Sequence, residues 1–340
     1  MISPTIDRAL RRRVRRLPRR LATLAVLASV VVAAAACGST SSSKSTPAST
    51  KSTSSGSLAS LLPPSIRSAG TITNGTPENN PPLIFLTGSQ ALTGIDYDLA
   101  QAMGKELGGK FTFQNIPFPG LIPALQSGRI DASLSILSDT PQRENTISFV
   151  DYIVDGVTLL GAYGNPQHIS TLSDLCGKTV GATQGAIEAQ FISNLSHEYC
   201  ISKGKPAISA ALYSSAADVL LALNSGRVVA DIHPGAASQY IAKTASGGKK
   251  YQLLFPGKLY LANYGGIGIP KSATRLGAAL VAALRKLQAN GTYGRILAHY
   301  GLSRMALTSQ QIAVNTATKV PLTAAQKKIY IGASPYITAK

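Results

Sequence analysis

One arginine in the middle of the chain stands where its side chain could bind an anion. Thr140 and Pro141 make a good N-cap and first helical residue, so the pattern predicts that Arg143 lies in the first turn of a helix. That turn has free backbone N–H groups, and a planar guanidinium can donate two hydrogen bonds to one carboxylate. An arginine there opposes the helix dipole, which disfavours a purely structural role. A surface salt bridge is the alternative.

The histidines do not have the spacing of a metal site. His168, His197, His233 and His299 form no H-x-x-x-H pair and no cluster with Cys or Asp, so each is expected to be a surface or loop residue. The sequence also lacks G-x-S-x-G and a pair of carboxylates at a motif spacing. We therefore expect no metal, no cofactor and no catalysis.

The first 36 residues are expected to be a signal peptide. Eight arginines precede an apolar run at residues 21–36, which is shorter than the roughly twenty residues of a membrane-spanning helix. The run ends in Ala34-Ala35-Ala36-Cys37-Gly38, which resembles a lipoprotein cleavage box. We expect a lipid on Cys37, with an uncleaved membrane anchor as the alternative. The arginines leave open whether export is general or twin-arginine.

Residues 38–60 are almost wholly Ser, Thr, Ala, Lys and Gly, which predicts an unfolded tether. With the lipid, the tether would hold an exported protein at the outer face of the cell membrane. The net charge of +18 falls to +11 without the signal, which contains eight Arg and Asp7. Because the remaining Lys and Arg are scattered and Trp is absent, nucleic acid is not an expected partner.

The other two cysteines, Cys176 and Cys200, are predicted to form a disulfide in an oxidising compartment. Closing a loop of about 25 residues would stabilise the fold by about 3.5 kcal/mol in the chain-entropy model. A redox-active pair is the alternative, but the spacing is not C-x-x-C.

The elements that must position these residues alternate between short β-rich runs and amphipathic helical stretches from about residue 69 to 303. This alternation predicts an α/β fold with parallel strands. Helices are expected at 96–107, 186–199 and 216–223, and strands at 71–74, 111–114, 132–136, 179–182, 228–232 and 266–269. The tail after Ser303 has weak periodicity, so we expect it to pack loosely or to be disordered.

Five ordered motifs resemble those of the family 3 extracellular solute-binding proteins, the amino-acid-binding components of ABC importers. They are GIDYDLA at 94–100, LIPALQSGRIDA at 121–132, SDTPQR at 138–143, GKTVGATQG at 177–185, and Gly291-Thr292-Tyr293 with Tyr300-Gly301. The resemblance covers roughly residues 69–302.

The resemblance implies a two-lobed periplasmic-binding-protein-like fold of type II, with a ligand cleft between lobes joined by two hinge strands. The implied division is signal 1–36, tether 37–68, lobe 1 at 69–160 and 265–303, lobe 2 with hinges at 161–264, and tail 304–340. Such a monomer would bind an amino acid or related small carboxylate, close over it and present it to ABC permease subunits.

The resemblance also implies ligand contacts. Arg143 would receive the α-carboxylate, Ser135 and Ser138 would touch the ligand at a strand end, and Phe118 would cover it. A turn role for the serines and a core position for Phe118 stay open. On the lobe 2 side, the turn before a helix would supply a second anion-contacting edge at Gln184 and Gly185.

Pro234 is the main departure from the family pattern. It stands where the family has an acidic residue that holds the α-ammonium of the ligand, and proline carries no charge. Asp231, Glu188 and Glu78 are acids near the expected cleft, and His233 could bond a polar ligand there. A buried ammonium without an anion is costly, so the site is expected to be re-tuned toward a different solute.

Two other functions stay open at this point. A few relatives of the fold are dehydratases that use an acid in the cleft, so a cleft enzyme is one alternative. A sensor lipoprotein that binds solute without feeding a transporter is the other.

Overall fold

The computed structural model describes residues 58–328 and the backbone of 330 and 331, all within one compact unit that spans residues 54–340. The predicted signal peptide, the predicted lipidation site Cys37 and most of the predicted tether lie outside the described residues. None of the helices in the described part is both long and apolar enough to cross a bilayer.

Lobe 1 is built on two parallel strands, β1 (Thr71–Thr76) and β5 (Lys110–Asn115), joined by helix α2 (Ile95–Leu107). The predicted helix is confirmed: Leu99, Met103 and Leu107 are fully buried on one face, and Gly108 ends the helix with a φ of 67°. Other elements of this lobe are η1 (Leu58–Leu61), α1 (Pro64–Ala69), η2 (Phe118–Gly120), α3 (Leu121–Gln126), β6 (Ser133–Ser138), α4 (Pro141–Glu144), α8 (Thr274–Ala289) and α9 (Thr292–His299).

A small antiparallel sheet lies near the start of lobe 1. It consists of β2 (Asn79–Asn80), β3 (Ile84–Leu86) and β4 (Leu92–Thr93). Gly94 follows it with a φ of 120°, and a Cβ there would lie 2.4 Å from the carbonyl oxygen of Leu83. Only glycine fits this close approach, which sets the start of α2.

Lobe 2 is built on β8 (Thr179–Thr183), which pairs in parallel with β9 (Ser209–Tyr213) and β10 (Ala230–Pro234). The predicted strands at 179–182 and 228–232 are thereby confirmed within a few residues. So is the disulfide, since Cys176 and Cys200 are bonded. The remaining elements of this lobe are η3 (Leu172–Leu175), α5 (Ile187–Leu195), η4 (Ser196–Cys200), η5 (Ile201–Lys203), α6 (Ala216–Asn224), α7 (Gly235–Thr244), η6 (Ala245–Gly248) and β11 (Tyr251–Leu253).

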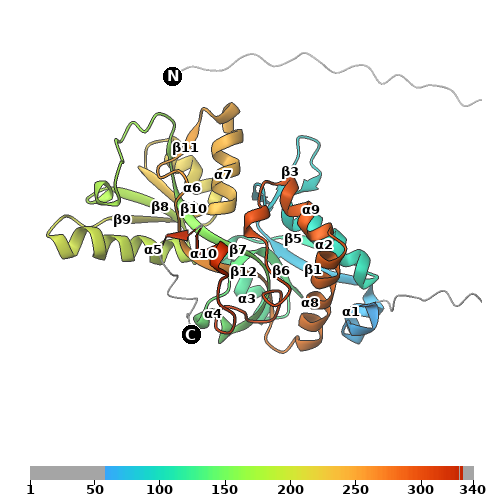
Figure 1. The fold of residues 1–340 in the computed structure, drawn as a ribbon. Helices are drawn as coiled ribbons and strands as arrows, with labels where there is room; N and C mark the ends of the chain where they lie inside the picture. Colours follow the sequence, from blue (N-terminus) through green and yellow to red (C-terminus); the bar gives the residue numbers. More distant parts are fainter. Residues whose placement is uncertain (1–57, 329, 332–340) are drawn as a thin grey trace, which may run out of the picture. The chain divides into compact units, whose positions relative to one another are not determined.

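Two long antiparallel strands, β7 (Ile147–Ala162) and β12 (Leu259–Pro270), belong to both lobes (Figure 1). Their lobe 1 halves pair with each other, and β12 also pairs with β6. Beyond Val157, β7 pairs instead with β10 and β11 of lobe 2. The register of the pair shifts between Tyr260 and Asn263, where Leu261 has a φ of 48°. The two strands are therefore the hinge of a two-lobed α/β fold, as expected.

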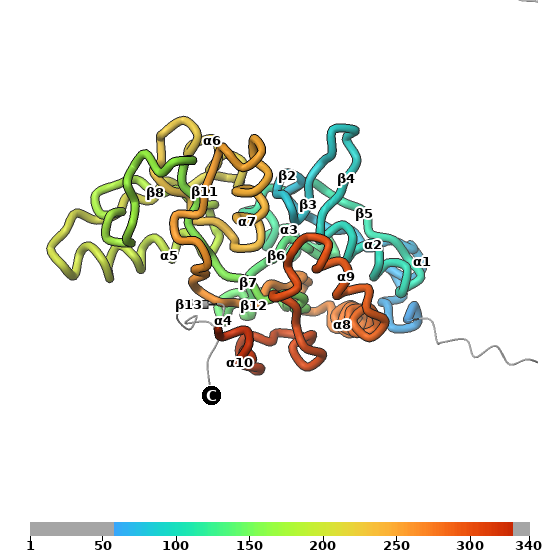
Figure 2. Tube along the Cα trace, turned by 45° about the horizontal axis from the view of Figure 1, so that its top comes forward, coloured from blue at the N-terminus to red at the C-terminus, as the bar shows by residue number. Residues whose placement is uncertain are grey.

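The expectation of a loose or disordered tail is wrong for its described part. After η7 (Ser303–Met305) the chain returns along β7, where the backbone N–H of Asn315 donates to Phe149 O and Phe149 N–H donates to the Asn315 side chain. Ile312 and Thr316 are fully buried. The chain continues through α10 (Ala324–Lys327) to β13 (Tyr330–Ile331), which pairs with β12 (Figure 2). The apolar side chains of the tail are too sparse to show a period in the sequence. They are nevertheless buried, because β7 and α8 provide an apolar surface against which they pack.

Candidate functional site

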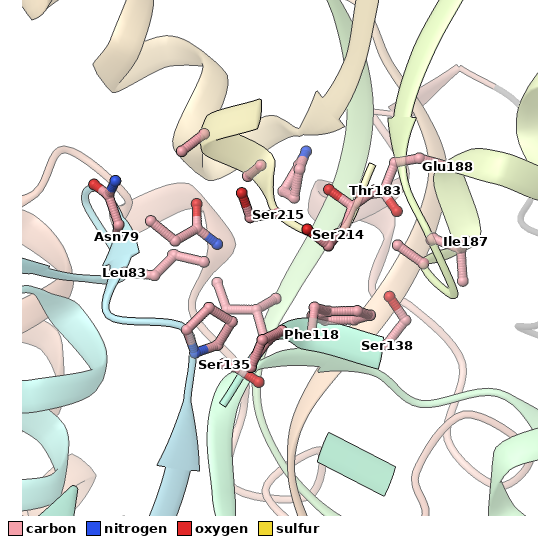
Figure 3. A pocket seen from close by; sticks show the side chains of 18 of the residues that line it. Asn79, Leu83, Phe118, Ser135, Ser138, Thr183, Ile187, Glu188, Ser214 and Ser215 are labelled. Atoms are coloured by element: carbon pink, nitrogen blue, oxygen red, sulfur yellow. The ribbon is translucent and has the colours of Figure 1, made fainter. Parts of the chain in front are cut away.

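A cavity of about 260 Å³ lies between the lobes. Its lobe 1 wall comes from the loop after β1, from η2 and from the end of β6, and its lobe 2 wall from the starts of α5 and α6 (Figure 3). The hinge strands form its floor through Asp155, Gly156, Val157 and Asn263. Solute sites of α/β proteins form where strand ends and helix starts converge in this way.

Arg143 lies beside this cavity and joins its walls. Thr140 caps α4 by accepting a hydrogen bond from the backbone N–H of Arg143, as predicted. The guanidinium donates from Nη1 to Ser138 O at 2.9 Å and from Nη2 to Gly185 O at 2.8 Å. Its Cζ lies 5.9 Å from the ring centre of Phe118. The side chain therefore reaches from lobe 1 to lobe 2 at the edge of the cavity, where a carboxylate could replace a carbonyl as its acceptor.

All four of the other lobe 1 candidates line the cavity. Phe118 and Ser138 lie on one side of it, and Ser135 lies at its base (Figure 3). The Ser135 hydroxyl is buried and lies 3.2 Å from the Ser133 hydroxyl. Glu78 also lines the cavity, from the loop that follows β1.

The lobe 2 candidates at the turn before α5 lie outside the lining of the cavity. Gln184 and Gly185 are exposed and do not line the cavity, although Gly185 O accepts from Arg143. Their neighbours Thr183, Ile187 and Glu188 do line it (Figure 3). Gly185 has a φ of 76°, so the turn brings the start of α5 to the cavity.

Asp231 and His233 lie behind the cavity and do not line it. Both are buried, and His233 Nδ1 lies 3.1 Å from Asp231 Oδ2. Burial alone would lower the pKa of His233, but the neighbouring carboxylates, Asp231 first among them, raise it. On the same strand, Pro234 does line the cavity and precedes α7.

Carboxylates dominate the charge of the cavity. Glu78, Asp155, Glu188 and Asp218 line it, and none of the described lining residues is Lys, Arg or His. Burial raises the pKa of Asp155 to about 7 and raises the pKa of Glu188, because a carboxylate loses hydration there. Arg143 and His233 partly oppose the shift at Glu188. A cation in the cavity would stabilise the ionised forms of these groups.

Sequence reasoning missed Asp155, Asn263 and Asp218. A usable signal existed for Asp155, since it interrupts the apolar run at 147–162. Asn263 interrupts the apolar run at 259–270 in the same way, whereas Asp218 carries no such signal. Within the described residues, no three His, Cys, Asp or Glu side chains converge as ligands for a metal.

Comparison with known proteins agrees with this geometry. The lysine/arginine/ornithine-binding periplasmic protein of Escherichia coli strain K12 is 32% identical over 238 residues, covering 68% of this chain and 87% of that protein. An ancestral arginine-binding protein bound to arginine is 28% identical with a TM-score of 0.60, covering 68% of this chain and 98% of that one. An ancestral amino acid-binding protein described as a precursor of cyclohexadienyl dehydratase is 26% identical with a TM-score of 0.61, covering 69% and 97%.

The motifs noted in the sequence fall within one family match. Residues 72–303 match the bacterial extracellular solute-binding proteins, family 3, which is more than half of the chain. The two lobes, the paired hinge strands and the cavity between them agree with that match. The chain belongs to the bacterial extracellular solute-binding proteins, family 3.

Proposed function

We propose that this protein is the substrate-binding component of an ABC importer and that its substrate is a cationic α-amino acid. The observation that carries the proposal is the charge of the cavity: four carboxylates line it, without Lys, Arg or His among its described lining residues. An anionic solute would be repelled by that field, whereas an extra positive charge on the ligand would offset it. Two similar proteins, an arginine-binding protein and a lysine/arginine/ornithine-binding protein, support the same class of ligand.

Arg143 accounts for the other end of such a ligand. Its guanidinium lies between the lobes and beside Phe118 and Ser138, which line the cavity. A carboxylate there would accept two hydrogen bonds from one planar group. Glu78 is the proposed partner of the cationic side chain, because it lines the lobe 1 wall. Ser135 and Ser138 would supply further polar contacts.

A thermal-shift screen of the purified full chain tests the proposal. We expect L-arginine, L-lysine, L-ornithine and L-histidine to raise the melting temperature, and L-glutamate and L-citrulline to raise it less, because binding to the folded state alone stabilises it. Citrulline is the matched control, since it has nearly the shape of arginine without the side-chain charge. A larger shift with glutamate than with every cationic amino acid would contradict the proposal.

We further propose that the protein binds without turnover, although one structural neighbour is described as a dehydratase precursor. Asp155 and Glu188 are buried carboxyl groups in the cleft, the kind of group a dehydratase would use as an acid. NMR distinguishes binding from catalysis. When the protein is incubated with prephenate, the spectrum of prephenate should stay unchanged. Loss of prephenate signals with enzyme-dependent kinetics would establish the catalytic function instead.

Export and anchoring through Cys37 complete the proposal and rest on the sequence. A lipid there and the Ser/Thr-rich tether would hold the protein at the outer face of the membrane, beside the permease. Expression in a bacterial host followed by membrane fractionation checks this. The Cys37→Ser variant is expected in the soluble extracytoplasmic fraction, and equal membrane retention of both forms would rule out the lipid.

A further inference from the structure

Pro234, which the family resemblance places where an acid would hold a ligand ammonium, carries no charge. Pro234 lines the cavity at the end of β10 and immediately precedes α7. The acid on the same strand, Asp231, is fully buried behind the cavity and faces His233. Strand β10 therefore does not offer the cavity an anion.

A carboxylate from the neighbouring hinge strand occupies the space beside Pro234. Strands β7 and β10 are antiparallel with Pro234 opposite Val157, which places Asp155 two residues away along β7. Its Oδ1 accepts from the backbone N–H of Gly156 at 2.7 Å and of Ala236, in the first turn of α7, at 3.2 Å. Asp155 is 2% exposed and lines the cavity.

A second acceptor belongs to a residue of the other hinge strand that also lines the cavity. Asn263 is the register partner of Asp155 on β12, and it is also 2% exposed and lines the cavity. Its Nδ2 donates to Leu261 O at 2.9 Å, which fixes the amide. Its buried Oδ1 has no hydrogen-bond partner among the described residues. A buried acceptor without a hydrogen bond costs free energy, so we expect this oxygen to accept a hydrogen bond from the ligand.

The two groups match the chemistry of an ammonium. An –NH₃⁺ group has three donors and one charge, and a carboxylate oxygen can accept more than one hydrogen bond. Asp155 Oδ2 keeps most of its capacity, because its protein contact, with Ala236 N, is long at 3.5 Å. We propose that Asp155 and Asn263, one from each hinge strand, form the ammonium site of this protein in place of the acid missing at Pro234. This inference rests on the proposed amino-acid ligand.

The competing role for Asp155 is structural, since it also holds the first turn of α7. Ligand chemistry separates the two roles. L-Arginine and its desamino analogue, 5-guanidinopentanoate, share the guanidinium and the carboxylate and differ only at the α-ammonium. Substituting a residue that merely supports α7 should weaken the binding of both ligands, and so should substituting a residue that binds the guanidinium. A residue that binds the ammonium affects arginine alone.

Calorimetric titration of the full chain with both probes is the test. We expect Asp155→Asn to weaken the binding of L-arginine at least about 30-fold, as for the loss of one partner of a buried charge pair. The binding of 5-guanidinopentanoate should weaken less than about threefold. Adding Pro234→Asp to Asp155→Asn should restore most of the arginine affinity. Asn263→Leu, which removes one neutral acceptor, should act in the same selective way with about a tenfold loss. Glu198→Gln, on the exposed face of lobe 2, is the control.

The outcomes are distinct. Equal weakening of both probes, or of neither, in Asp155→Asn overturns the ammonium site while leaving the proposed function in place. If Asp155→Asn does not fold, Asn263→Leu decides by the same comparison of probes. If the wild-type chain binds no amino acid of the screen, the proposed function fails and the ammonium site falls with it.

Discussion

The Nη2 atom of Arg143 donates to the carbonyl oxygen of Gly185, 2.8 Å away and 42 residues later in the chain. Arg143 belongs to lobe 1 and Gly185 to the turn that leads into α5 of lobe 2. Nη1 of the same guanidinium donates to Ser138 O within lobe 1. One planar group therefore connects the two lobes beside the cavity.

Arg143→Ala should weaken binding of L-arginine by about 2 to 5 kcal/mol, because it leaves the ligand carboxylate without its guanidinium partner. Arg143→Lys should recover only part of this, since an ammonium cannot form the two-pronged contact. Calorimetry measures both. Agmatine, which is arginine without the carboxylate, should bind wild type and Arg143→Ala alike; an equal loss for agmatine would show that the variant disturbs the lobes rather than a carboxylate contact.

Affinity for a cationic amino acid should fall as the pH drops. Burial raises the pKa of Asp155 to about 7 and that of Glu188 above its usual range, and a bound cation favours the ionised carboxylates. Below about pH 7 a proton competes with the cation, so the dissociation constant should rise by up to about tenfold per pH unit per group. Titrations from about pH 8 to about pH 6 check this. 5-Guanidinopentanoate should show a shallower dependence, and parallel profiles would assign the effect elsewhere.

Stability should rise on mild acidification. Asp96 is fully buried and accepts a hydrogen bond from the Tyr152 hydroxyl at 2.6 Å, and burial raises its pKa from 3.8 to about 7. The folded state then binds a proton at Asp96 more tightly than the unfolded chain does, so this one group should increase the free energy of unfolding by up to about 1.4 kcal/mol per pH unit as the pH falls from about 7 toward 4. Urea unfolding at several pH values measures it.

The matched variant for this effect is Asp96→Asn, which should flatten the pH dependence of stability without changing the fold. Asp155 is also buried with a raised pKa, so Asp96→Asn should remove only part of the slope. An unchanged slope would mean that Asp96 does not titrate in this range.

Opening the disulfide should destabilise lobe 2. Cys176 and Cys200 are 24 residues apart, and removing that loop constraint from the unfolded chain is expected to cost about 3.5 kcal/mol in the chain-entropy model. The double variant Cys176→Ser/Cys200→Ser should melt at a lower temperature, and reductant should lower wild type to the same value. If reductant lowers the melting temperature of the double variant as well, the reductant acts on something other than this disulfide.

Removing the tail should destabilise the whole unit. A chain that ends after Thr308 loses Ile312 and Ala317 from the core and Gln311 from a buried network in which it donates to the Tyr264 hydroxyl. We expect a loss of at least about 3 kcal/mol from the apolar burial alone. Calorimetric melting measures it. Ser309→Ala, an exposed position in the same segment, is the control and should leave the melting temperature unchanged.

Much of the fold could be predicted because its elements carry local signals. The stripe of Leu99, Met103 and Leu107 determines one face of a helix, and Thr140 with Pro141 marks a helix start, whatever the rest of the chain does. The place of Asp155 and Asn263 in the cavity depends instead on the register between strands 108 residues apart, which periodicity does not encode. The tail was mispredicted for the same reason: Ile312 is buried by a surface that other segments build.

The return of the tail along the hinge has a practical consequence for measuring lobe motion. The segment contacts β7 at Phe149 and then pairs with β12 at Leu259 and Tyr260, close to the shift in register. A fluorescent protein fused after this segment would therefore be attached next to the hinge and would perturb the lobe rotation that it is meant to report. Dyes for distance measurements belong on exposed positions such as Lys105 and Lys203, one on each lobe, where they leave the tail and the hinge strands untouched.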